Sequence, residues 1–358
     1  MEHLALSASS HFCSPVALPS EFLSGPTSPR RLRNITLNWL YLPALPQLLL
    51  SNRDLISLHL GYFTLTWRRF ISPEVLSAAL STTTQLEYLY IYCIPENTEP
   101  HPQSISENSS PLNLAVLPAL TYFHFGGSIE YMERLVSRIH SPHLEKLEVF
   151  SKFSHQGVWD IPQLSQFISR TERLSSLPFR TSISLQMRNF SVGHHFRFLP
   201  SPQEVSRVFF RCDGMEDWQA SQIYHISTQL SPLASDVKEL KISAFHLPLN
   251  LKRKTDPAPW LQLLTPYNNV EEVEFRGEGA ACTGIASALE HSTRETAQEL
   301  LPALRVLRIR GFDTSSSRLI TSFVATRQLT GRPVVIRRLN PRSQDTDWET
   351  FENDTRRD

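Results

Sequence analysis

The sequence repeats one short phrase: an apolar residue, two free positions, a second apolar residue, one free position and a third apolar residue. Its clearest copy is Leu86-Glu-Tyr-Leu89-Tyr-Ile91. The phrase begins at residues 1, 32, 55, 86, 120, 144, 205, 237, 270 and 304, and a weaker copy covers residues 183–187. Alternating apolar and free residues are typical of a β-strand with one buried face. A recurring unit of this kind constrains the fold more strongly than any single motif.

Helical patterns lie between the phrases. Ser72 and Ser128 are suitable N-cap residues, each followed by apolar residues at helical spacing. Helices are expected at residues 74–83, 129–139, 162–172, 217–230, 284–300 and 316–328. The phrase matches the strand of a leucine-rich repeat, although the spacing between phrases is less regular than the usual roughly 20–29 residues. We therefore expect an α/β leucine-rich-repeat-like solenoid, a curved horseshoe with a parallel sheet on its concave face and helices on its convex face.

One domain is expected over residues 1–339, because a stacked array grows by contacts between neighbouring units. Residues 333–336 are predicted to form the last strand, and the polar residues 340–358 a disordered tail. The polar insertions at 95–113, 190–204 and 249–259 are predicted to be loops. Because a phrase begins at Met1 with no preceding cap, we expect the N-terminal end to be uncapped. The chain would then be the distal part of a longer product, or a partner would cover this end.

Composition argues against several classes of protein. The 35 Lys and Arg residues balance the 35 Asp and Glu residues, so charge favours no nucleic-acid partner. No signal peptide and no apolar run long enough to cross a bilayer is found, so no membrane role is expected. Cys13, Cys93, Cys212 and Cys282 are scattered and form no paired motif, which favours a reducing compartment. The predicted location is the cytoplasm or the nucleus.

The free positions of the phrase predict which side chains face the open side of the sheet. The third, fifth and seventh positions alternate with the buried ones. In the units beginning at 55, 86 and 120 these positions place six aromatic or imidazole side chains together: His59, Tyr88, Tyr90, Tyr92, Tyr122 and His124. Tyrosine is enriched where proteins bind proteins, so this patch is a candidate binding site. The alternative is that the rings only stabilise the sheet by stacking, or that an insertion covers them.

A second candidate surface lies in the C-terminal half. The fifth positions carry Phe209, Lys241, Glu274 and Arg308, and the alternating charges among them favour mutual support within the sheet. The seventh positions carry Arg211, Ser243, Arg276 and Arg310. These arginines would suit an acidic or phosphorylated segment, because the guanidinium fork matches such groups. A solvated basic edge is the alternative interpretation.

No pattern for catalysis is recognised. The sequence has no Gly-x-Ser-x-Gly, no His-Glu-x-x-His and no ordered triad signature. His140 with His143, and His194 with His195, have no third ligand close by in the sequence. The protein is therefore predicted not to be an enzyme, with no cofactor and no metal.

Several longer strings resemble the repeat region of the large F-box/leucine-rich-repeat-like family of mushroom-forming (basidiomycete) fungi. They are Phe70-Ile-Ser-Pro-Glu-Val-Leu-Ser77, Thr84-Gln-Leu-Glu-Tyr-Leu89, Leu117-Pro-Ala-Leu-Thr-Tyr-Phe123, Tyr131-Met-Glu-Arg-Leu-Val-Ser-Arg-Ile139 and Ile161-Pro-Gln-Leu-Ser-Gln-Phe-Ile-Ser-Arg-Thr171. The resemblance covers about residues 15 to 340 and implies that the repeats select a protein for a ubiquitin ligase. No F-box fits in the sequence, so binding to the ligase adaptor would require a longer product that carries one.

The function expected from these observations is protein–protein interaction without catalysis. The chain would be the substrate-recognition region of an F-box-type ubiquitin-ligase subunit, binding an unidentified protein. The alternative is a repeat sensor fragment of an immune-type or signalling receptor. Such a receptor would need a nucleotide-binding or membrane module upstream.

Overall fold

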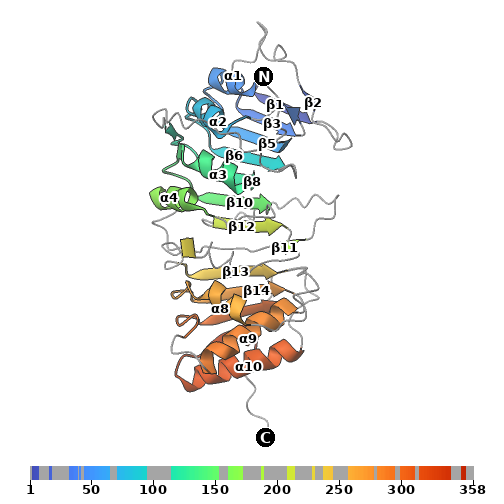
Figure 1. Ribbon diagram of the computed structural model, residues 1–358, viewed down its shortest axis with the longest axis vertical. Coiled ribbons are helices and arrows are strands. Elements are labelled where there is room, and N and C mark those ends of the chain that lie inside the picture. The colour runs from blue at the N-terminus through green and yellow to red at the C-terminus, as the bar shows by residue number, and fades with distance from the viewer. Residues whose placement is uncertain are drawn as a thin grey trace. The chain divides into compact units, whose positions relative to one another are not determined.

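The computed structural model describes residues 2–7, 16–17, 32–38, 40–41, 44–64, 71–94, 114–152, 160–171, 187–188, 208–213, 228–229, 237–244, 257–277, 280–294, 299–310, 314–339 and 348–351 (Figure 1). The chain forms two compact units. Unit 1 comprises Met1–Ser154 and Ile161–Leu177, and unit 2 comprises His155–Asp160 and Pro178–Asp358. Both units are mixed α/β with mainly parallel strands, which confirms the predicted fold class at this level.

Unit 1 contains a parallel sheet in which each strand pairs with the strand of the next phrase along the chain (Figure 1). The strands in order are β1 (His3–Ser7), β3 (Asn34–Asn38), β5 (Ser57–Thr64), β6 (Tyr88–Ile94), β8 (Tyr122–Gly127) and β10 (Lys146–Lys152). Two short parallel pairs join β2 (Val16–Ala17) to β4 (Leu40–Tyr41) and β7 (Ala115–Val116) to β9 (Ile139–His140). The apolar positions of neighbouring phrases are in register, as Leu89 is with Phe123.

The helices of unit 1 are α1 (Leu45–Ser51), α2 (Pro73–Leu80), α3 (Ile129–Val136) and α4 (Pro162–Arg170). Each contacts the next, and Figure 1 shows them together along one side of the strands. The predicted caps are confirmed: Ser72 Oγ accepts a hydrogen bond from the Val75 N–H, and Ser128 Oγ accepts one from the Tyr131 N–H. Helix α1 was not predicted from the sequence.

The apolar positions of the phrase form the core, as predicted. In the phrases beginning at 32, 55, 86, 120, 144, 237, 270 and 304, all three apolar side chains are at most 3% exposed. Leu4 and Leu6 of the first phrase differ, because they are only half-buried on β1 at the edge of the sheet. The phrase at 183 lies largely outside the described residues, as do Val205 and most of the helix predicted at 217–230. The insertions predicted at 95–113 and 190–204 also lie outside them.

Unit 2 has a short parallel pair, β11 (Met187–Arg188) with β12 (Val208–Asp213), and a five-stranded sheet. In that sheet β13 (Glu239–Ala244), β14 (Glu272–Gly277), β15 (Val306–Arg310) and β16 (Val335–Leu339) are parallel. Strand β17 (Trp348–Phe351) pairs with β16 in the antiparallel direction. The helices are α8 (Ala258–Leu264), α9 (Ala280–Arg294) and α10 (Thr314–Leu329).

Three elements of unit 2 differ from the sequence-based expectations. Residues 348–351 of the predicted disordered tail form β17, because the open edge of β16 offers hydrogen-bonding groups to a further strand. Helix α8 begins inside the predicted loop 249–259. Helix α9 begins at Ala280, so Gly284 lies within it rather than before it. A Cβ at residue 284 would lie 2.4 Å from Trp260 Nε1, so this glycine permits α8 to approach α9 closely.

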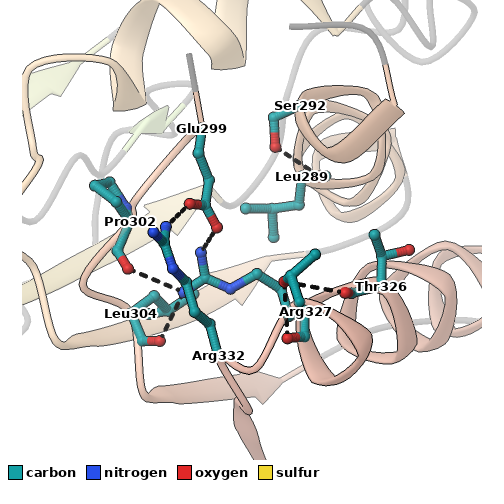
Figure 2. Close-up of polar contacts among 9 residues, drawn as sticks. Leu289, Ser292, Glu299, Pro302, Leu304, Thr326, Arg327 and Arg332 are labelled. Carbon is teal, nitrogen blue, oxygen red and sulfur yellow. Dashed lines mark hydrogen bonds and ion pairs between the residues drawn. The ribbon is translucent and has the colours of Figure 1, made fainter. Parts of the chain in front are cut away.

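A buried arginine joins α10 to the turn that enters β15, as Figure 2 shows. The Arg327 guanidinium donates hydrogen bonds to the Pro302 carbonyl at 3.2 Å and the Leu304 carbonyl at 3.0 Å. It also pairs with the Glu299 carboxylate, whose other oxygen pairs with Arg332 (Figure 2). A buried guanidinium is tolerated where its N–H groups have acceptors. Arg327 thus satisfies carbonyls of a turn that contains Leu301, a non-glycine residue with φ of 51°.

Candidate functional site

The six residues predicted as a patch lie together on neighbouring strands of unit 1. His59 is on β5, Tyr88, Tyr90 and Tyr92 are on β6, and Tyr122 and His124 are on β8. The parallel register places Tyr88 opposite Tyr122 and Tyr90 opposite His124, with His59 opposite Tyr90 on the other side. These six side chains are called the aromatic face below.

The centre of the aromatic face is a stack of three rings. The ring centroids of His59 and Tyr90 are 4.0 Å apart with planes 12° from parallel, and those of Tyr90 and His124 are 4.1 Å apart at 11°. Tyr90 is therefore held between two imidazoles from the strands on either side. Cross-strand ring pairs of this kind contribute to sheet stability, so part of the face is structural.

Glu148 and Lys146 of β10 lie beside Tyr122 and His124 of the aromatic face. Neither residue was singled out from the sequence. The Glu148 carboxylate accepts a hydrogen bond from Tyr122 Oη at 2.6 Å, and Glu148 Oε2 lies 2.9 Å from His124 Nδ1. Its other oxygen lies 2.8 Å from Lys146 Nζ. Lys146 also lies 5.1 Å from the centre of the Tyr122 ring. Both occupy free positions of the phrase that begins at 144, Lys146 the third and Glu148 the fifth, so the alternation that identified the other face residues also identifies these two.

The protonation states follow from burial and these contacts. Burial and the neighbouring His124 lower the pKa of His59 to about 4. Burial also lowers the pKa of His124, outweighing the opposite effect of Glu148. Burial alone raises the pKa of Glu148, but hydrogen bonds from His124, Lys146 and Tyr122 bring it down to about 2. Near neutral pH both imidazoles are uncharged, and the ionised Glu148 accepts a hydrogen bond from the N–H group at His124 Nδ1.

The side chains of the aromatic face differ in how far they are exposed to solvent. Tyr88 is 49% exposed, whereas His124 is only 6% exposed. The Tyr88 and Tyr122 rings are 6.4 Å apart and tilted by 48°, so Tyr88 is not flattened against its neighbour. Tyr92 lies over Gly126 of β8. Tyr88 is thus the ring best placed to contact another molecule, while His124 supports the face from beneath.

The second candidate surface is only partly described. Arg310 is exposed at the end of β15, and the backbone register places it opposite Arg276 of β14. The side chains of Arg276 and of Arg211 on β12 lie outside the described residues, as do those of Phe209, Lys241 and Ser243. The register thus places the backbones of Arg276 and Arg310 side by side, and the prediction that the three arginines form one surface stays a prediction.

The alternating charges of unit 2 make contacts within the sheet. Glu274 is buried and lies opposite Arg308 in the register. Arg308 also forms an ion pair with Glu272, two residues before Glu274 on β14. Burial raises the pKa of Glu272, although Arg308 opposes this change. These contacts agree with the structural interpretation of Glu274 and Arg308.

Among the described residues, no group of three or more His, Cys, Asp or Glu side chains is placed to hold a metal ion. None of the helices in the described part of the chain is long and apolar enough to cross a bilayer. Comparison with models of known protein families finds no match, and comparison with curated proteins finds none either.

Proposed function

We propose that this protein is a non-enzymatic repeat scaffold that binds another protein through the aromatic face of unit 1. The observation that carries the proposal is the half-exposed ring of Tyr88, which lies beside side chains fixed by stacking and hydrogen bonds. Consecutive phrases pair in parallel within each sheet, which supports a leucine-rich-repeat-like solenoid with this face on its concave side.

Rigidity favours this role. Side chains that are already ordered lose little conformational entropy when a partner binds, so binding to them is less costly. Tyr90 is already held between two rings, and Tyr122 is held by Glu148. Exposed tyrosines on an ordered surface are typical of residues that dominate binding energy.

The resemblance to the fungal F-box/leucine-rich-repeat-like family extends the proposal to a cellular role. The bound protein would be a substrate that a ubiquitin ligase modifies. Binding to the ligase adaptor would belong to an F-box in a longer product. If this role is correct, the captured partner should accumulate in cells when the protein is depleted, and an unchanged half-life of that partner would contradict it.

Photo-crosslinking tests the binding surface directly. A benzoylphenylalanine in place of Tyr88 should crosslink a partner, whereas the same residue in place of Val75 should not. Val75 is a matched control because it is 48% exposed but lies on α2. The double variant Tyr88→Ala/Tyr90→Ala should reduce capture of that partner while the far-ultraviolet circular dichroism spectrum is unchanged. Equal crosslinking at both positions, or unaltered capture, would exclude the aromatic face.

A further inference from the structure

The two sides of the aromatic face differ in how many of their polar groups are already bonded. On the side of β8 and β10, Tyr122, His124, Lys146 and Glu148 bond to one another. On the side of β3, β5 and β6, the side-chain polar groups of Thr36, Asn38, Ser57, His59 and Tyr88 make no hydrogen bond with the residues that the structure describes. These five residues are called the open patch below. Half of the face is thus satisfied internally, and the other half retains free donors and acceptors.

The open patch is continuous. The register places Ser57 opposite Tyr88, and Thr36 opposite His59. Asn38 lies opposite Gly61, where a Cβ would be only 2.0 Å from Asn38 Oδ1 and 3.0 Å from His59 Nε2. The absent side chain at residue 61 therefore lets the Asn38 amide and the His59 ring approach the same point.

The open patch contains a buried acceptor that is not satisfied. Asn38 Oδ1 is buried and has no hydrogen-bond partner in the described part of the chain. An unsatisfied buried acceptor costs about 1–3 kcal/mol.

The open patch also lacks charge. Asparagine, serine, threonine and tyrosine are neutral near pH 7, and His59 is uncharged there because burial and His124 lower its pKa to about 4. At the starts of the strands, Arg33 and Glu87 are both exposed and have opposite signs. The side chains described on this side of the face therefore create no net field that would attract a strongly charged partner.

The spacing of the open patch fits an extended polypeptide. Side chains two residues apart on a strand are separated by about 6.6–6.8 Å, which is also the two-residue repeat of an extended peptide. A peptide lying along β3 and β5 would therefore meet polar side chains at every second residue, with an apolar side chain against Tyr88. Amide and hydroxyl groups offer both donors and acceptors, as the peptide main chain requires.

We infer that the open patch of Thr36, Asn38, Ser57, His59 and Tyr88 binds an uncharged, extended peptide segment of the partner. The inference rests on the proposed function, because it starts from His59 and Tyr88 of the aromatic face and names the neighbouring residues that the partner also contacts and the chemistry of the bound segment. It assigns binding to β3 and β5 in addition to the tyrosines of β6.

A displayed library of random peptides, selected against the full chain, tests this assignment. The most enriched peptide, labelled with a fluorophore, is titrated by fluorescence anisotropy at 50 and 500 mM NaCl. We expect an uncharged peptide whose Kd changes by less than about threefold between the two salt concentrations, since screening weakens only charged contacts.

Thr36→Val/Ser57→Ala, which removes two hydroxyl groups, should raise Kd about tenfold. Thr330→Val, an exposed threonine after α10, should leave it unchanged.

The outcomes distinguish this inference from the proposed function. A charged peptide that weakens about tenfold or more in high salt would overturn the inference, while dependence on Tyr88 would preserve the proposed function. An unchanged Kd in Thr36→Val/Ser57→Ala, with unaltered melting temperature, would exclude the open patch. Peptide binding that is insensitive to Tyr88→Ala would overturn both. Cellohexaose serves as a neutral glycan probe, and binding of this probe instead of peptides would also overturn both.

Discussion

The ring of Tyr92 lies across Gly126 of the neighbouring strand, where a Cβ would be only 2.3 Å from Tyr92 Cδ2. The two residues are opposite each other in the register of β6 and β8. The glycine therefore makes room for the tyrosine, and an aromatic ring covers a backbone that has no side chain of its own. This pairing positions the outer edge of the aromatic face.

Gly126→Ala should destabilise unit 1 by about 1–3 kcal/mol, because the added methyl group forces the Tyr92 ring out of its position. Urea unfolding measures the loss. In a Tyr92→Ala background the same substitution should cost much less, since the clash is with the ring. An equal cost in both backgrounds would show that Gly126 is needed for another reason.

Glu133→Ala should reduce the stability of α4 by about 0.5–2 kcal/mol, the usual cost of losing a helix cap. Helix α4 has no cap of its own, and the Glu133 carboxylate from α3 accepts hydrogen bonds from the Gln163 and Leu164 N–H groups, both at 2.8 Å. Amide hydrogen exchange should become faster at Gln163 and Leu164.

Glu130→Ala is the matched control for this effect. Glu130 is an exposed glutamate of the same helix, in the first turn of α3. Its removal should leave exchange at Gln163 and Leu164 unchanged. Equal acceleration in the two variants would argue against capping of one helix by its neighbour.

The repeated phrase predicted the strands and their core because alternation directly reports which side chains a sheet buries. It also predicted which residues share the aromatic face, since the register follows from equal positions in successive phrases. Helices α2 and α3 were predictable from Ser72 and Ser128, whose side chains bond within the same helix. These features depend on residues close together in the sequence.

Features that depend on distant residues were not predictable. Helices α1 and α8 have seven residues each, too few for a clear helical period. Strand β17 depends on the free edge of β16. The bonds from Glu148 to Tyr122 and His124 join residues 26 and 24 positions apart. Alternation places these side chains on one face but does not identify which of them bond.

Arg327→Met should destabilise unit 2 by about 1–3 kcal/mol, the range found when buried hydrogen-bonding groups lose their partner. The Arg327 side chain is 1% exposed, and its loss leaves the Pro302 and Leu304 carbonyls without these donors. Arg332→Ala is the control, because Arg332 pairs with the same Glu299 but is 53% exposed. That substitution should cost less than about 1 kcal/mol. Similar losses in the two variants, measured by urea unfolding, would contradict a dominant role for Arg327.

Acid should destabilise unit 1 partly through His59. Its pKa is about 4 in the folded protein, compared with about 6.5 for an unperturbed histidine. Between these values the unfolded chain binds more protons than the folded one, so stability falls as the pH is lowered from about 6.5 to about 4. Below that range the folded protein also takes up the proton, and this contribution levels off.

Nuclear magnetic resonance of the histidine rings should give a titration midpoint near 4 for His59, compared with about 6.5 for an unperturbed histidine. His59→Phe keeps a flat ring against Tyr90 but cannot take up a proton. The melting temperature of this variant should therefore fall less between pH 7 and pH 5 than that of the unmodified protein. A midpoint near 6.5 for His59, or the same acid sensitivity in the variant, would mean that the imidazole is not buried in the stack as described.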